Sequence, residues 1–128
     1  MTKFFPRFLL VFSALVLATG AFMHASAFHK IVSALNESNL VSFAANALKV
    51  LWLMDSAVAL ILATVFAFAA IRPSAANKWI IVLLSLIPGA TAALLYAFMG
   101  NFIGGHVMLM AAATASIAGL LYPPSRRD

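Results

Sequence analysis

VLWLMDSAVALILATVFAFAAI, residues 50–71, is the stretch that decides the fold class of this chain. Asp55 is its only charged residue, and about 20 consecutive apolar residues in a helix cross the ~30 Å hydrocarbon core of a bilayer. The stretch therefore predicts a membrane-spanning helix. A carboxylate at that depth costs about 3 kcal/mol if it stays ionised and unpaired, so we expect Asp55 to have a partner, a proton or a polar cavity.

The composition of the whole chain agrees with that prediction. Of its 128 residues, 65% are hydrophobic and only 9% are charged, and the mean hydropathy is +1.07. A soluble domain has about 25% charged residues, because its surface needs more polar groups than this chain has. We therefore expect one integral membrane domain over residues 1–128. The chain has no cysteine, which excludes disulfides, thiolate metal sites and dithiol redox chemistry.

Three further apolar runs accompany the first. Backbone groups in lipid must be bonded within the protein, so each run predicts an α-helix. Turn signals at Pro73 and at Gly100-Asn101 separate the runs, whereas Pro88-Gly89 lies inside one and should kink it. The predicted fold class is an all-α integral membrane protein with four transmembrane helices in an up-down bundle. The helices are expected over residues 8–28, 43–71, 78–99 and 102–122, with an outer loop over residues 29–42.

The basic residues set the expected orientation. The two termini and the 72–78 turn carry six of the eight Lys and Arg residues, and the opposite side carries Lys30 and Lys49. Basic loops stay on the cytoplasmic side, so we expect cytoplasmic N- and C-termini in a bacterial inner (plasma) membrane. We expect no nucleic-acid partner, since that would need a clustered basic face. The six residues are Lys3, Arg7, Arg72, Lys78, Arg126 and Arg127.

The first apolar run has a second interpretation. Lys3 and Arg7 precede it and Ala25-Ser26-Ala27 ends it, which is the pattern of a secretory signal peptide cleaved after residue 27. The run is longer than the usual signal-peptide core of about 7–15 residues, so we favour a retained helix. Cleavage would leave three helices with the same orientation.

Polar side chains gather in the predicted outer half of the bundle, where we expect a pocket built by all four helices. Asp55 begins a row with Ala59, Ala63 and Ala67 at i,i+4 spacing, and small residues on one face favour contact with other helices. That row turns Asp55 toward the bundle. The candidate pocket residues are His24, Lys49, Trp52, Asp55, Tyr96, Asn101 and His106.

Three of these residues have the chemistry of a cofactor site. His24, Asp55 and His106 carry the donor types of a divalent-metal site, and the two histidines could be the axial ligands of haem b. No specific motif such as HExxH accompanies them. Because an Asp–His pair that holds helices together explains the same residues, we expect no cofactor and keep haem b or a divalent metal as the alternative.

We expect the chain to be an accessory or scaffold subunit of a membrane assembly and not an enzyme. The Ala59 row and the small residues Ala112, Ser116 and Gly119 are helix-contact surfaces available for a homo-oligomer or a larger membrane-protein partner. The first alternative is a small redox or ligand-binding membrane protein that uses the histidine and aspartate pocket.

The second alternative is a proton-coupled small transporter with Asp55 as the working carboxylate. In length and helix count the chain resembles the dimeric small multidrug-resistance transporters. That family has an essential membrane-embedded glutamate in its first helix, whereas residues 8–28 contain no acid. The resemblance does not extend to the family's motif, and we do not assign the chain to it.

Overall fold

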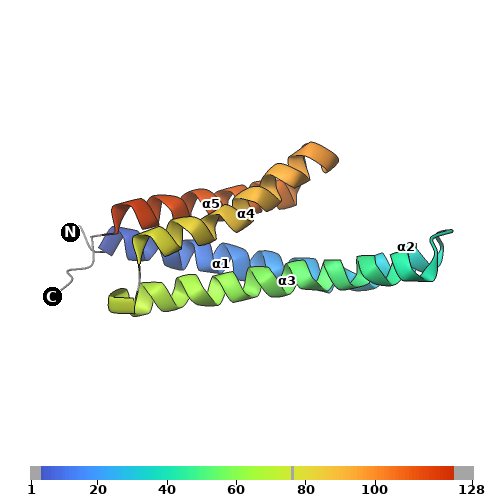
Figure 1. The fold of residues 1–128 in the computed structure, drawn as a ribbon, viewed down its shortest axis with the longest axis horizontal. Coiled ribbons are helices and arrows are strands. Elements are labelled where there is room, and N and C mark those ends of the chain that lie inside the picture. Colours follow the sequence, from blue (N-terminus) through green and yellow to red (C-terminus); the bar gives the residue numbers. More distant parts are fainter. Residues whose placement is uncertain (1–3, 76, 123–128) are drawn as a thin grey trace.

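The computed structural model describes residues 4–75 and 77–122, and over these residues it is all-helical, without a strand. Four segments of it, residues 4–36, 42–71, 78–99 and 103–121, are long and apolar enough to cross a membrane. These findings confirm the prediction of an all-α chain with four such helices. Figure 1 shows α1 (Phe4–Ser26), α2 (Phe28–Asn36), α3 (Ser42–Ile71), the short 3-10 turn η1 (Pro73–Ala75), α4 (Lys78–Met99) and α5 (Ile103–Leu121).

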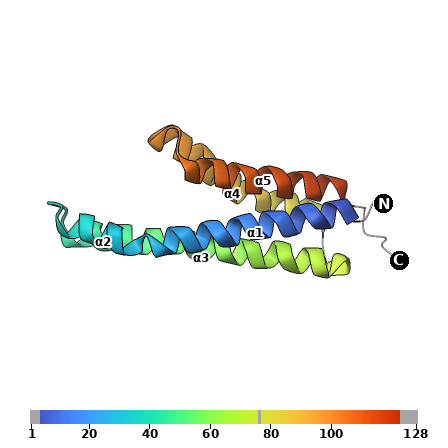
Figure 2. The same cartoon turned by 180° about the vertical axis from the view of Figure 1, so that it is seen from behind.

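The helices are arranged as two pairs. α1 packs along α3 and α4 packs along α5, and α1 also packs against α5, which joins the pairs. α3 and α4 are consecutive in the chain but hardly touch (Figures 1 and 2). We call the end with Phe4, Leu121 and the α3–α4 connection the terminal end. At the opposite end, the hairpin end, α2 and the start of α3 extend beyond the α4–α5 turn (Figure 1).

Five residues that entered the predictions lie outside the described part of the chain, at its two ends. Three of them are basic residues counted for orientation, and the other two are prolines that follow the predicted last helix, where the sequence Tyr122-Pro123-Pro124 predicts the end of that helix. They are Lys3, Pro123, Pro124, Arg126 and Arg127.

Small side chains let α1 and α3 approach closely. The buried core is rich in alanine and surrounds the fully buried Leu10, Leu17 and Phe66. Ala59 and Ala63 are 4% and 5% exposed and belong to this core, because α1 packs along the face of α3 that carries them. Our expectation that this alanine row is free for a partner is wrong, since the chain uses it internally.

The α4–α5 interface is fitted even more tightly. A Cβ atom added to Gly119 would lie 2.8 Å from Val82 Cγ2, closer than real Cβ atoms come, and 3.1 Å from the carbonyl oxygen of Lys78, closer than most of them come. The hydroxyls of Ser85 and Ser116 share a hydrogen bond of 2.6 Å across the same interface. Ser116 and Gly119, predicted as partner surface, therefore also serve contacts within the chain.

Local signals in the sequence define α4. The side chain of Asn77 accepts the backbone N–H of Trp79 at 2.9 Å and so caps the start of the helix. Pro88 lies inside α4, and because proline has no N–H, the carbonyl of Leu84 loses its helical donor. Gly100 follows the last turn with a φ of +70°, a conformation that glycine adopts without strain.

Residues 29–42 are not the loop that we predicted. α2 occupies Phe28–Asn36, and the non-helical connection is only residues 37–41. Phe28, Ile31, Val32 and Leu35 follow the i, i+3, i+4, i+7 pattern of an amphipathic helix. All four are half-buried, and α2 packs against α3. Packing of this apolar face against α3 stabilises a helix that is too short to be stable alone.

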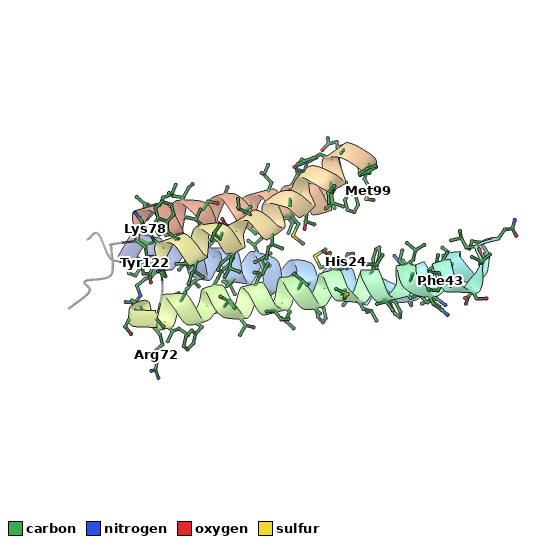
Figure 3. The ribbon with its side chains drawn as sticks, viewed as in Figure 1. His24, Phe43, Arg72, Lys78, Met99 and Tyr122 are labelled. Carbon is green, nitrogen blue, oxygen red and sulfur yellow. The ribbon has the colours of Figure 1, made fainter. Side chains whose placement is uncertain are left out.

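Two hydrogen bonds between helices close the terminal end. Arg7 Nε donates to the carbonyl of Ala70 at 2.8 Å, and the Tyr122 hydroxyl donates to the carbonyl of Ala69 at 3.0 Å. Both acceptors are among the last four carbonyls of α3, which have no donor within the helix. Burial raises the pKa of Tyr122, and the positive charge of Arg7 acts in the opposite direction. Figure 3 labels Tyr122 at this end.

Candidate functional site

His24 is the centre of a polar cluster between α1 and α3 (labelled in Figure 3). Its Nδ1 lies 2.9 Å from Ser56 Oγ, and its ring stacks on the indole of Trp52, with centroids 3.9 Å apart and planes 15° apart. Its Nε2 lies 3.9 Å from Asp55 Oδ2. That distance is too long for a hydrogen bond but short enough for a strong attraction when the imidazole is charged. Three side chains of α3 thus meet one side chain of α1.

Helix geometry explains why these residues meet. Trp52, Asp55 and Ser56 are three and four positions apart, so they share one face of α3. α1 ends at Ser26, and the carbonyl of His24, in its last turn, accepts the backbone N–H of Ala27 at 3.2 Å. Trp52 Nε1 donates to that carbonyl at 2.9 Å. The indole therefore both caps the end of α1 and covers one face of the His24 ring.

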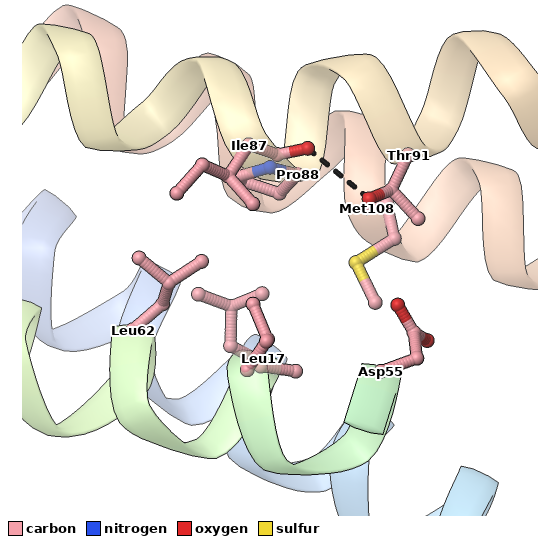
Figure 4. Close-up of a pocket in the computed structure, with 9 residues that line it drawn as sticks. Leu17, Asp55, Leu62, Ile87, Pro88, Thr91 and Met108 are labelled. Carbon is pink, nitrogen blue, oxygen red and sulfur yellow. Dashed lines mark hydrogen bonds between the residues drawn. The ribbon is translucent and has the colours of Figure 1, made fainter. Parts of the chain in front are cut away.

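Asp55 also lines a small, partly open pocket between residues of α1, α3, α4 and α5 (Figure 4). Its volume is about 10 Å³, roughly the space of one water, whereas small-molecule sites take roughly 300–1,000 Å³. Thr91 Oγ1 donates to the carbonyl of Ile87 at 3.1 Å, the dashed line in Figure 4. Asp55 is the charged residue of this lining and Thr91 its other polar residue; the remaining residues are apolar, namely Leu17, Val58, Ala59, Leu62, Ile87, Pro88 and Met108.

His106 belongs to a second cluster, within the α4–α5 pair. Its Nδ1 is hydrogen-bonded to the Tyr96 hydroxyl, and its Nε2 lies 2.7 Å from Asn101 Oδ1. A carbonyl oxygen only accepts, so Nε2 carries the hydrogen and Nδ1 accepts the Tyr96 O–H. Gly105 allows the Tyr96 ring to approach, since a Cβ there would lie 3.0 Å from Tyr96 Cε1. Both ring nitrogens are satisfied with the imidazole neutral.

The predicted pocket residues form two clusters and not one. The α4–α5 pair diverges from the α1–α3 pair toward the hairpin end (Figures 1 and 2). Within the described residues no group of three His, Cys, Asp or Glu side chains is close enough to hold a metal. The metal set that we considered, His24 with Asp55 and His106, is therefore not assembled. The first cluster holds His24, Trp52 and Asp55, the second holds Tyr96, Asn101 and His106, and Lys49 is half-buried on α3, one turn before Trp52.

Sequence reasoning missed Ser56, which is 8% exposed and bonds His24 directly. A signal was present, because Ser56 is four positions after Trp52 and next to Asp55. A helix face that turns both of those residues toward α1 also carries Ser56. A serine on one helix does not by itself indicate a bond to a histidine on another. The contact could be predicted only once the helix that packs against Ser56 was known.

Comparisons of the chain with protein-family models, with curated proteins and with solved structures find no match. What the protein does is therefore inferred from its own residues.

Proposed function

We propose that this protein is a small, non-enzymatic scaffold subunit of a membrane assembly, with its four long helices crossing the bilayer up and down. One observation carries the proposal: all four ring nitrogens of His24 and His106 face side chains of this same chain. These two candidate ligand residues thus connect neighbouring helices. Ser13 has the same role, since its hydroxyl donates to the carbonyl of Ala111 between α1 and α5 at 2.9 Å.

Haem ligation would conflict with these bonds. An axial histidine needs a nitrogen lone pair that is free to reach iron, and His106 would first have to leave Tyr96 or Asn101. At His24, Nδ1 is hydrogen-bonded to the Ser56 hydroxyl and Nε2 faces the carboxylate of Asp55. The redox alternative is therefore less well supported. The transporter alternative is weakened by the space beside Asp55, which suits one water better than an organic substrate.

The side on which α3 and α4 hardly touch is the surface that we assign to the partner. The Asp55 side chain is 41% exposed there, and the neighbouring apolar residue Ile87 is also 41% exposed. Lipid on this side would leave a carboxylate against hydrocarbon, which is costly. A transmembrane helix of a second copy or of another protein would cover Asp55 and offer it a polar contact.

The proposed orientation places the terminal end in the cytoplasm. Arg7, Arg72 and Lys78 belong to that end, whereas Lys30 and Lys49 lie toward the hairpin end. This bias follows the positive-inside rule and is compatible with the inner membrane of a bacterium. α2 and the start of α3 would then extend outward from the membrane, since the 33 residues of 4–36 span about 50 Å at 1.5 Å per residue, more than the ~30 Å core.

Site-specific photocrosslinking in cells tests the scaffold proposal. We expect a photoreactive amino acid at Ile87 to give a discrete crosslinked product, because a partner helix covers that position. Leu15 on α1 is the matched control, since it is apolar and 61% exposed but lies on a helix that already packs against two neighbours. Crosslinking from Ile87 that does not exceed crosslinking from Leu15 would contradict a partner on this side.

An absorbance spectrum and metal analysis of protein purified from a haem-replete host separate the scaffold from the redox alternative. We expect no haem band and less than one metal ion per chain. A haem band that disappears in both His24→Ala and His106→Ala would overturn the proposal and establish the redox protein in its place.

A further inference from the structure

Asp55 is the polar side chain of residues 50–71 that makes no hydrogen bond in the described structure. Its distance to His24 Nε2, 3.9 Å, is too long for one. The other polar side chains of this stretch are each hydrogen-bonded within the chain, namely those of Trp52, Ser56 and Thr64. A carboxylate within a bilayer needs a donor or a positive charge beside it, so Asp55 still lacks a contact.

The missing contact lies on the side of the bundle that we assign to the partner. Asp55 on α3 and Ile87 on α4 line the same pocket and are both partly exposed there (Figure 4). The other polar side chain of that pocket, Thr91, already donates its hydroxyl hydrogen to the carbonyl of Ile87, and a hydroxyl has one hydrogen to donate. The pocket itself therefore leaves Asp55 without a donor, and a partner helix on this side would have to supply one.

A second copy of this chain would bring no basic side chain to the depth of Asp55. Lys and Arg are absent from the four apolar runs, residues 8–28, 50–71, 79–99 and 102–122. Lys49 is six positions before Asp55, about 9 Å away along the helix axis, and the rings of His24 and His106 already face side chains of their own chain. In a symmetric dimer the same patch of each copy meets, so two Asp55 carboxylates would approach each other, and like charges oppose association.

We propose that the partner is a different protein whose transmembrane helix carries a Lys or Arg that pairs with Asp55. This inference rests on the proposed scaffold function and specifies its partner. A basic residue within a bilayer is as costly alone as Asp55 is, so each residue stabilises the other and the pair selects against helices that lack the charge. Asp55 is 17 positions before Arg72, which places the basic residue about 25 Å from the cytoplasmic end of the partner helix at 1.5 Å per residue.

Mass spectrometry of the product that a photoreactive amino acid at Ile87 forms in cells identifies the partner. Ile87 and Asp55 line the same pocket, so the probe captures the helix that covers the carboxylate. We expect a different protein, with a Lys or Arg in the crosslinked transmembrane segment. A product of two copies of this chain, or a partner helix without a basic residue, would overturn the inference and leave the scaffold function standing. Crosslinking no greater than that from Leu15 would overturn both.

Two variants of Asp55, made in the chain with the photoreactive Ile87 position, test whether the partner recognises the charge. Asp55→Glu keeps the carboxylate and should keep the product. Asp55→Asn should lower its yield by at least about tenfold, because the desolvated base of the partner loses its counter-charge. Glu37→Gln is the matched control, since it makes the same acid-to-amide change at an exposed residue after α2 and should leave the yield unchanged. Equal yields from Asp55→Asn and Glu37→Gln would mean that lipid or water lies beside Asp55, and the inference would be wrong.

An exchange of the two charges separates loss of the pair from loss of the fold. Asp55→Lys should abolish the Ile87 product, because two positive charges would then meet. Replacement of the basic residue of the partner by Asp should restore the product in cells that carry Asp55→Lys. Restoration requires a chain that still folds, so a folding defect cannot produce it. A product that is lost in Asp55→Lys and is not restored by the exchange would contradict a direct pair.

Discussion

Gly119→Ala is the substitution whose cost follows most directly from the structure. The new Cβ atom would lie 2.8 Å from Val82 Cγ2, 3.1 Å from Ile81 Cγ2 and 3.1 Å from the carbonyl oxygen of Lys78. The first two are side-chain methyl groups that can move slightly. The third is backbone, so α4 and α5 themselves would have to separate.

Gly89→Ala is the matched control on the other side of the same interface. Its Cβ would lie 3.7 Å from the Cβ of Ala112, an ordinary contact. Both substitutions replace a helical glycine by alanine, which by itself favours the helix by about 1 kcal/mol. Overpacking costs about 1–3 kcal/mol and applies to Gly119 only. The free energy of unfolding should therefore be about 1–3 kcal/mol lower for Gly119→Ala than for Gly89→Ala.

Reversible unfolding of both variants in the same detergent, followed by circular dichroism, measures that difference. We expect Gly89→Ala to be as stable as the unchanged protein or more stable, and Gly119→Ala to be the least stable of the three. Equal stabilities of the two variants, within about 0.5 kcal/mol, would refute the close approach of α4 and α5 at Gly119.

Three further predictions concern orientation, the polar cluster and the terminal end. Reporter fusions after Arg72 and at the C-terminus should report cytoplasm and a fusion at Asn36 the opposite side; a C-terminal reporter on the outer side would contradict the four-helix topology. Asp55→Asn should lower the free energy of unfolding near neutral pH by less than about 1 kcal/mol, because the pair with His24 is partly exposed, and a stabilising effect measured in the same unfolding assay would argue against any pairing. Tyr122→Phe keeps the ring but removes the hydrogen bond to α3, so it should cost about 1 kcal/mol in thermal unfolding; no change would mean that this bond is not formed.

The four long helices could be predicted from the sequence because their signal is a property of whole segments. Apart from Asp55, residues 50–71 carry no charge, and in lipid a helix is the structure that satisfies the backbone hydrogen bonds of such a segment. The turn at Gly100 could also be predicted directly, since it depends on one residue type. α2 was missed because residues 36–39, at and after its end, are polar and led us to predict a loop over residues 29–42, although Phe28, Ile31 and Leu35 carry a helical period.

The site could be predicted only in part, because the sequence gives the depth of a residue in the bilayer but not the neighbour that it faces. His24 and Asp55 were expected to meet, and they lie 3.9 Å apart. His106 was placed with them, yet its bonds are made with Tyr96 and Asn101. The order of the helices around the bundle decides this difference, and no single residue encodes it.

The measurement that most directly tests a structural role of the polar residues is a double-mutant cycle between His24 and Ser56. His24→Phe keeps the ring on Trp52, and Ser56→Ala removes the hydroxyl that lies 2.9 Å from Nδ1. Unfolding of both single variants and of the double variant in detergent gives the coupling energy of the pair. A structural role predicts a coupling energy of about 0.6 kcal/mol, the average for hydrogen bonds between membrane helices, and at most about 1.7 kcal/mol. A coupling energy of zero would mean that His24 does not hold α1 against α3, and the account of its role would fail.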